Sequence, residues 1–139
     1  MKRVVLCRPQ GPRNVGMVLR VVENFGPCEL VLVKPERPAL LVHPEFTQMS
    51  HGVEDALRAL RIVDALTEAL EDCTHVVGFT ARGRDNTILE DWMRVKEDVA
   101  ARLQTEGERV ALVFGNEAAG MDAAEAGLCH RLVHIRTSP

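Results

Sequence analysis

Short apolar runs that lack polar alternation constrain the fold of this sequence more than any other feature. The segment His75–Thr80 reads HVVGFT and the segment Arg109–Phe114 reads RVALVF. A strand with one exposed face alternates apolar and polar residues, whereas a strand covered on both faces does not. The runs therefore predict a mainly parallel sheet flanked by helices, which is the α/β class.

Five segments share this strand pattern, and helical patterns separate them. The predicted strands are Arg3–Cys7, Glu29–Val33, His75–Thr80, Arg109–Phe114 and Arg131–Ile135. The predicted helices cover 12–25, about 52–60, 66–72, 92–104 and a short stretch from about Asp122. In the first helix apolar residues recur at the i, i+3, i+4, i+7 spacing, and a Gly-Pro pair ends it. The alternation of the two patterns favours parallel strands joined by helical crossovers.

The length of 139 residues suits one ordinary domain, so we expect residues 1–139 to form a single folded unit. The formal net charge of −3 excludes a global positive field that would attract nucleic acid or an anionic membrane. No stretch approaches the roughly 20 apolar residues of a membrane span, and the first residues do not read as a signal peptide. We therefore expect a cytoplasmic protein.

Glycine, asparagine and arginine cluster after the carboxyl ends of the predicted strands. The clusters are 8–14, 81–85, 115–120 and the residues from Arg136 onward. In open parallel sheets, ligands bind in the crevice beyond these strand ends. The loops are therefore candidates for one binding site, although loops also attract such residues for reasons of chain geometry.

The loop 115–120, GNEAAG, is the most informative of these clusters. Its glycines let main-chain groups approach a ligand, but the Lys and Ser/Thr of a P-loop and the three-glycine dinucleotide fingerprint are missing. Glu117 would repel phosphate, so a nucleoside without a triphosphate fits better. A dinucleotide-dependent enzyme is a less favoured alternative, and a turn whose glycines serve only geometry is another.

Arg20 lies one helical turn after Gly16, on the side of the first predicted helix opposite its apolar stripe. Helical side chains lean toward the N-terminus, so the Arg20 guanidinium is expected near Asn14 at the helix start, where anions are favoured. An ordinary solvated arginine is the plain alternative.

Charged residues form two local clusters. The first 20 residues contain no acid, and their basic residues are Lys2, Arg3, Arg8, Arg13 and Arg20. We expect these residues, extended by Arg82 and Arg84, to form a local basic patch, which is the kind of surface that contacts nucleic acid. The acidic cluster is Asp64, Glu68, Glu71 and Asp72, which we expect to be a solvated helix face.

The four cysteines, Cys7, Cys28, Cys73 and Cys129, are widely separated and have no zinc-ligand spacing. We expect inert thiols and no metal site. The pair Cys129-His130 suggests a nucleophile and a base, but neighbours on a strand point to opposite faces.

Four segments together resemble a known class of enzymes. They are RPQGPRNVGMVLRVVENFG, EDCTHVVGFTARGR, ALVFGNEAAGM and HIRTSP, and they span essentially the whole chain in this order. The sequence resembles the SPOUT (α/β-knot) class of S-adenosylmethionine-dependent RNA 2′-O-methyltransferases, and within it the TrmJ-like branch of the TrmH family.

The resemblance implies roles for residues at matching positions. The implied catalytic-site residues are Asn14, Arg20 and Glu117. The implied cofactor-binding residues are Phe79, Thr80, Ala81, Gly115 and Ile135. In the family the arginine is regarded as catalytic. Because a guanidinium rarely gives up its proton, we assign Arg20 to holding an RNA phosphate and stabilising the developing alkoxide rather than to acting as a base.

The resemblance also implies an activity: methylation of a ribose 2′-hydroxyl, most simply in an anticodon-loop pyrimidine of tRNA, by a homodimer that uses neither a metal nor a membrane. The alternatives are a ribosomal RNA methyltransferase of the same family and a non-catalytic RNA-binding homologue. The family's third motif and C-terminal helix, which thread the knot and complete the cofactor pocket, are not found in the sequence. We therefore expect a domain that lacks them.

Overall fold

The computed structural model describes residues 2–11, 28–35, 60–80, 88–116 and 119–135. Its strands are β1 (Lys2–Cys7), β2 (Glu29–Val33), β3 (Arg61–Val63), β4 (His75–Phe79), β5 (Leu89–Asp91), β6 (Val110–Phe114) and β7 (Arg131–His134). Its helices are α4 (Leu66–Ala69), α5 (Trp92–Gln104) and α6 (Ala123–Gly127). No helix in this described part of the chain is long and apolar enough to cross a membrane.

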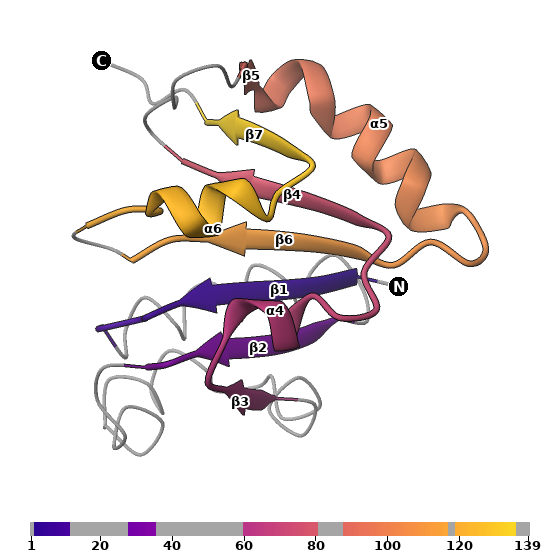
Figure 1. Cartoon of the computed structure of the whole chain (residues 1–139). Helices are drawn as coiled ribbons and strands as arrows, with labels where there is room; N and C mark the ends of the chain where they lie inside the picture. Colours follow the sequence, from indigo (N-terminus) through magenta and orange to yellow (C-terminus); the bar gives the residue numbers. More distant parts are fainter. Residues whose placement is uncertain (1, 12–27, 36–59, 81–87, 117–118, 136–139) are drawn as a thin grey trace.

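All seven strands form one sheet in the order β3-β2-β1-β6-β4-β7-β5. Every pairing between neighbours is parallel, so the carboxyl ends of all the strands lie along one edge, on the left in Figure 1. The structure thereby confirms the predicted α/β class. The strand order is the reason why loops far apart in the sequence become neighbours in space.

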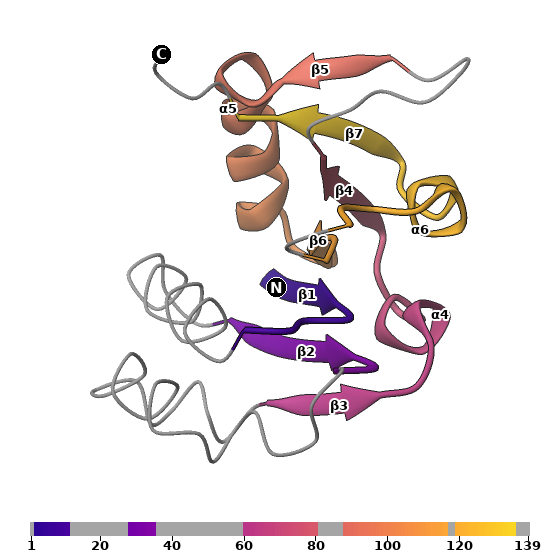
Figure 2. The ribbon, with the colours of Figure 1, turned by 90° about the vertical axis from the view of Figure 1, so that its left-hand side faces the viewer.

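Helices cover both faces of the sheet, as Figure 2 shows: α5 lies on one face, and α4 and α6 lie on the other. Buried side chains on the α5 face are Val77, Val95, Val99, Val110 and Val133. Buried side chains on the α4 and α6 face include Val5, Val31, Leu66, Val113 and Met121. The unbroken apolar runs of the sequence are thus explained by burial on both sides.

The predicted elements agree with the observed ones to within about a residue where strands are long and buried. The predicted helix 92–104 matches α5, whereas the predicted helix 66–72 ends early, at Ala69. The edge strands β3 and β5 were not predicted, because each has three residues and none of them is buried. The predicted helices 12–25 and about 52–60 lie outside the described residues, apart from position 60.

Side-chain caps fix where α5 and α6 begin. The carboxylate of Asp91 accepts a hydrogen bond from the N–H of Met93 (3.0 Å) at the start of α5. At the start of α6, Asp122 accepts from the N–H of Glu125 (2.7 Å), and Glu125 accepts from the N–H of Asp122 (2.8 Å). This reciprocal capping box satisfies main-chain donors that a helix start leaves unpaired.

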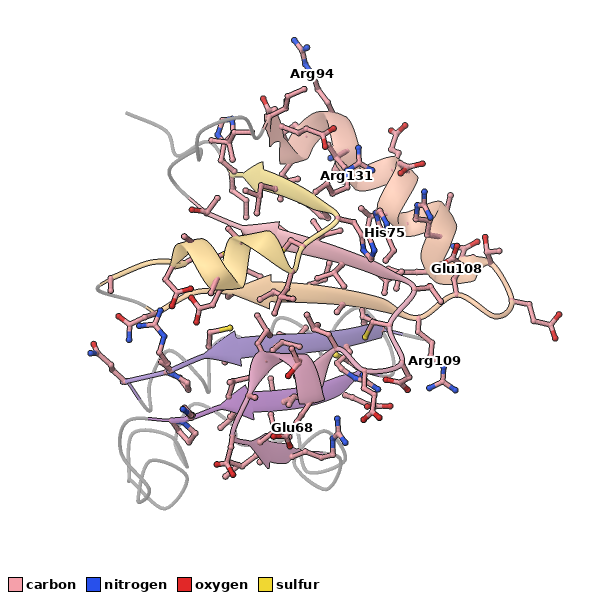
Figure 3. All side chains as sticks on the ribbon, viewed as in Figure 1. Glu68, His75, Arg94, Glu108, Arg109 and Arg131 are labelled. Atoms are coloured by element: carbon pink, nitrogen blue, oxygen red, sulfur yellow. The ribbon has the colours of Figure 1, made fainter. Side chains whose placement is uncertain are left out.

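Arg3 is buried at the amino end of β1, with 4% of its surface exposed. Its guanidinium donates to Asp72 (2.6 Å), to Glu29 (3.0 Å) and to the carbonyl of Ala69 (2.9 Å). Arg109 also pairs with Asp72 (2.7 Å), and Figure 3 shows Arg109 near the amino ends of the strands. Asp72 lies past the end of α4, and its half-exposed carboxylate is paired with Arg3 and Arg109, so it links this turn to β1 instead of belonging to an unpaired helix face.

The predicted basic patch also needs correction, because strand direction separates its members. Lys2 and Arg3 are buried at the amino end of β1, whereas Arg8 follows its carboxyl end. Arg13, Arg20, Arg82 and Arg84 lie outside the described residues. Lys2 and Arg3 therefore do not join a patch at the strand ends.

The chain turns back on itself after β6. The N–H of Gly120 donates to the carbonyl of Asn116 (2.8 Å), and the N–H of Asn116 donates to the carbonyl of Gly120 (3.1 Å). Gly120 has φ +73°, a conformation that glycine adopts at little cost. A Cβ on Gly115 would lie 2.4 Å from the main-chain nitrogen of Met121, so no side chain fits there.

We expect Gly115→Ala to lower the free energy of unfolding by about 1–3 kcal/mol, because the added methyl group meets main chain that cannot rotate away. The matched control is Gly127→Ala in α6, where a Cβ would meet no described atom within 4 Å. That variant should be neutral or more stable by up to about 1 kcal/mol. Urea unfolding of both variants makes the comparison, and equal effects would contradict the close approach at Gly115.

The Arg3–Asp72 pair predicts a pH dependence of stability. The hydrogen bond from Arg3 lowers the pKa of Asp72 from 3.8 to about 2. A lowered folded-state pKa stabilises the fold above about pH 4, and this contribution is lost as the pH falls toward 2. Asp72→Asn should therefore lower the free energy of unfolding by about 1 kcal/mol at pH 6 and by less at pH 3. The expected value is small because Asp72 is half-exposed. Urea unfolding at both pH values tests this, with the exposed neighbour Glu71→Gln as control; a cost independent of pH would argue against the pair.

Candidate functional site

The carboxyl ends of β6, β4 and β7 meet at one edge of the sheet. Phe114 of β6 is in register with Phe79 of β4, which is in register with Val133 of β7. The N–H of Thr80 continues the ladder past β4 by donating to the carbonyl of Val133 (3.0 Å). Thr80 and Gly115, which follow these strands directly, are therefore neighbours at the edge.

The structure brings together the predicted cofactor-binding residues that it describes: Phe79, Thr80, Gly115 and Ile135. Ile135 follows β7 directly and is 56% exposed, so its apolar side chain is available at this edge. The remaining predicted site residues, Asn14, Arg20, Ala81 and Glu117, lie outside the described residues.

The ring of Phe79 packs on the α5 side of this edge. It stacks on Phe114 with ring centroids 4.6 Å apart, and its centroid lies 5.0 Å from that of Trp92 at the start of α5. Because these contacts occupy the ring, main-chain groups are the part of Phe79 that can contribute to a ligand site.

Asn116 holds the loop after β6 in place, a role that the sequence analysis did not assign. Its side chain is buried; the amide nitrogen donates to the carbonyl of Arg8 (2.7 Å), and the amide oxygen accepts from the N–H of Ala119 (2.7 Å). The sequence signal for this role is the asparagine itself, which is common at the start of a turn. Its partner Arg8 is far away in the sequence and gave no signal.

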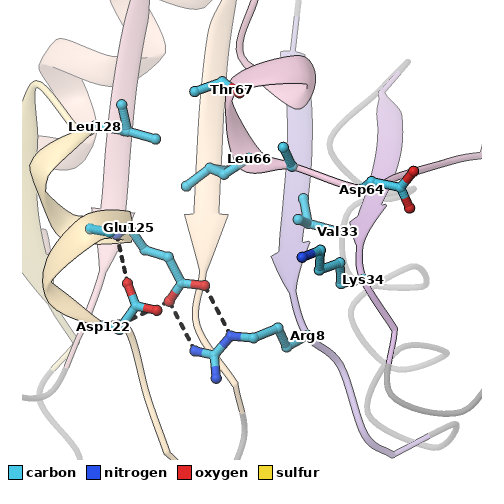
Figure 4. A pocket seen from close by; sticks show the side chains of 11 residues that line it. Arg8, Val33, Lys34, Asp64, Leu66, Thr67, Asp122, Glu125 and Leu128 are labelled. Carbon is cyan, nitrogen blue, oxygen red and sulfur yellow. Dashed lines mark hydrogen bonds and ion pairs between the residues drawn. The ribbon is translucent and has the colours of Figure 1, made fainter.

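Arg8 joins the end of β1 to the same loop. The Nε and Nη2 atoms of Arg8 donate to the two carboxylate oxygens of Glu125 (3.1 and 3.0 Å), and Nη2 also donates to the carbonyl of Gly120 (3.1 Å). Figure 4 shows this two-point contact beside the Asp122 cap. Glu125, only 8% exposed, raises the pKa of Arg8 above its usual value. Arg8 therefore forms an internal ion pair instead of contributing to the predicted basic patch.

Arg8 adopts an unusual main-chain conformation, with φ +51°. This left-handed region costs a non-glycine residue about 1 kcal/mol or more. The N–H of Arg8 donates to the carbonyl of Val33 (2.7 Å), which helps to hold the conformation. Strained residues persist where surrounding contacts impose them, and such places cluster at functional sites.

An open groove of about 320 Å³ lies beside Arg8, between α4 and α6 (Figure 4). Its lining includes the apolar side chains of Val33, Leu66 and Leu128 and the charged side chains of Lys34 and Asp64. The groove lies past the carboxyl ends of β1, β2 and β3, whereas Thr80 and Gly115 lie past β4 and β6.

Cys7, Cys129 and His130 do not act as nucleophiles in this structure. Burial raises the pKa of Cys7 to about 12 and that of Cys129 to about 11, so both thiols stay protonated at neutral pH. The Nδ1 atom of His130 accepts a hydrogen bond from the N–H of Val76 (2.8 Å), which is a structural role. Within the described residues, no group of three or more His, Cys, Asp or Glu is placed to hold a metal ion.

Comparison with known proteins shows which proteins this chain is similar to. A TrmJ from Pseudomonas aeruginosa, a tRNA (cytidine/uridine/adenosine-2′-O-)-methyltransferase, is 39% identical over 138 residues, which are 99% of this chain and 52% of that protein. The chain spans about half the length of the curated relatives it matches.

Solved structures share the fold. The crystal structure of a "Probable Methyltransferase" from Bordetella pertussis has a TM-score of 0.86 at 36% identity, covering 99% of this chain and 82% of that one. TrmJ from Z. mobilis has a TM-score of 0.83 at 26% identity, covering 100% and 60%. The profile of the SpoU rRNA methylase family matches residues 1–139. The chain therefore belongs to the SpoU rRNA methylase family.

Proposed function

We propose that this chain transfers a methyl group from S-adenosylmethionine to a ribose 2′-hydroxyl of tRNA. The observation that carries the proposal is the meeting of Thr80, Gly115 and the end of β7 at one edge of the sheet, in a member of a methylase family. The TrmJ relative, named for 2′-O-methylation of tRNA, supports tRNA over ribosomal RNA as the substrate.

The described residues at this edge fit the proposed cofactor. Exposed Ile135 offers an apolar surface for the adenosine part of the cofactor, and the main chain of Thr80 and Gly115 lies beside it at the strand ends. When bound, S-adenosylmethionine supplies a methyl group activated by a positively charged sulfur.

Other residues complete the proposed site by their match to the family motifs. Ala81 joins the cofactor-binding set, Glu117 shapes the loop, and Asn14 supports the start of the first helix. Arg20 holds the phosphate next to the acceptor ribose with its planar fork and stabilises negative charge on the 2′-oxygen. These groups act by positioning and electrostatics, which this reaction needs most.

In this proposal the protein works as a homodimer that binds RNA across both subunits. It acts in the cytoplasm, where tRNA is modified. The 2′-hydroxyl requirement makes RNA, not DNA, its nucleic-acid partner.

The central test incubates the full-length protein with methyl-labelled S-adenosylmethionine and, in parallel reactions, a tRNA pool or ribosomal RNA, followed by nucleoside analysis. We expect a 2′-O-methyl pyrimidine in the anticodon loop. Label found only in ribosomal RNA would redirect the substrate, and RNA binding without methyl transfer would indicate a non-catalytic homologue. A rise in melting temperature with NAD instead of S-adenosylmethionine would favour the dinucleotide alternative.

We expect Arg20→Lys to slow methyl transfer by at least about tenfold, because lysine keeps the charge but loses bidentate phosphate binding. Binding of S-adenosylmethionine, measured by calorimetry, should be unchanged. The control is Arg94→Lys on the exposed side of α5, which should transfer methyl groups at the normal rate. Normal transfer by the Arg20 variant would argue against the two-point contact.

A further inference from the structure

Arg8 connects three parts of the fold: the end of β1, the loop after β6 and the start of α6. It contacts the carboxylate of Glu125 in α6 at two points and the carbonyl of Gly120 at the end of the loop. The carbonyl of the same residue accepts from Asn116 at the start of the loop (2.7 Å). Both ends of the loop that follows Gly115 thus contact one residue, Arg8, which directly follows β1.

The capping of α6 does not require this contact. Asp122 and Glu125 already exchange hydrogen bonds with each other's main chain, which completes the helix start. What Arg8 adds is the link from the Glu125 carboxylate to the Gly120 carbonyl. The contact therefore fixes the loop relative to the helix and to β1.

Lys34 provides an internal comparison, because it has the same main-chain arrangement one strand further on. Its φ is +46°, and its N–H donates to the carbonyl of Val63 (3.0 Å), as the N–H of Arg8 donates to that of Val33. Among the described residues, no hydrogen bond or ion pair engages the exposed Lys34 ammonium group. The two positions share a main-chain conformation, but only Arg8 uses its side chain to contact the loop and α6.

We propose that Arg8 is a positioning residue for the cofactor site: its two-point contact with Glu125, its bond to Gly120 and its carbonyl contact with Asn116 hold the two ends of the loop after Gly115 where S-adenosylmethionine binding needs them. This inference rests on the proposed function. Arg8 does not touch the cofactor; it acts through Gly120, Asn116 and the start of α6. The planar fork of arginine suits two carboxylate oxygens and a carbonyl together, which a lysine ammonium does not reproduce.

The test uses the full-length protein and measures the Kd for S-adenosylmethionine by calorimetry, together with KM for the cofactor and for tRNA. Arg8→Met should weaken cofactor binding and raise its KM by about tenfold or more, the effect of losing hydrogen bonds to a charged group. KM for tRNA should stay within about twofold. Arg8→Lys should restore part of the cofactor affinity, and Lys34→Met should bind like the wild type.

A second variant separates positioning from simple loss of stability. Arg8→Met leaves the buried Glu125 carboxylate without its partner, which is destabilising in itself. In Arg8→Met/Glu125→Gln this charge is gone, and glutamine can still complete the capping box. We expect the double variant to regain melting temperature but not cofactor affinity.

Three outcomes would overturn the inference. Cofactor affinity within twofold of wild type in Arg8→Met would show that cofactor binding does not depend on the contacts of Arg8. Recovery of both melting temperature and affinity in the double variant would show that Arg8 acts only through stability. A wild-type protein that binds no S-adenosylmethionine would overturn the proposed function as well, which distinguishes that failure from the first two.

Discussion

The structure depends on β1, the strand that joins the two halves of the sheet. It pairs with β2 on one side and β6 on the other, and all six of its residues are buried. Without β1 the strands β2 and β3 would have no main-chain pairing with β6, β4, β7 and β5. The parallel pairing on both sides also aligns the strand ends, so the loop after β6 lies next to the residue that ends β1.

An arginine at each end of β1, Arg3 buried and Arg8 partly buried, plays a different role. At the amino end, Arg3 binds Asp72 and Glu29 and joins the strand to the end of α4 and to β2. At the carboxyl end, Arg8 binds Glu125 and Gly120 beside the candidate cofactor site. Charged side chains lose hydration when buried, and each arginine is compensated by carboxylate and carbonyl oxygens. The first contact stabilises the fold, and the second constrains a loop.

The long buried strands and α5 could be predicted from the sequence because burial on both faces and helical periodicity are local patterns. The edge strands β3 and β5 could not, since pairing with β2 and β7 defines them and three residues show no periodicity. The meeting of Thr80, Gly115 and Ile135 followed from the rule for parallel sheets. The predicted basic patch was wrong in including Lys2 and Arg3, because counting charges along the chain ignores strand direction: residues 2 and 8 are separated by roughly 20 Å of extended chain. The contacts of Arg8 with Asn116 and Glu125 join residues more than 100 positions apart, which no local pattern reveals.

The packing of Trp92 against Phe79 has a practical consequence. The chain contains one tryptophan, and its ring touches the residue that precedes Thr80 at the candidate cofactor edge. Indole emission responds to the polarity and packing of its surroundings, and here all of it comes from a single place in the fold. The protein therefore carries an intrinsic optical reporter beside its candidate site, which needs no dye and no engineered label.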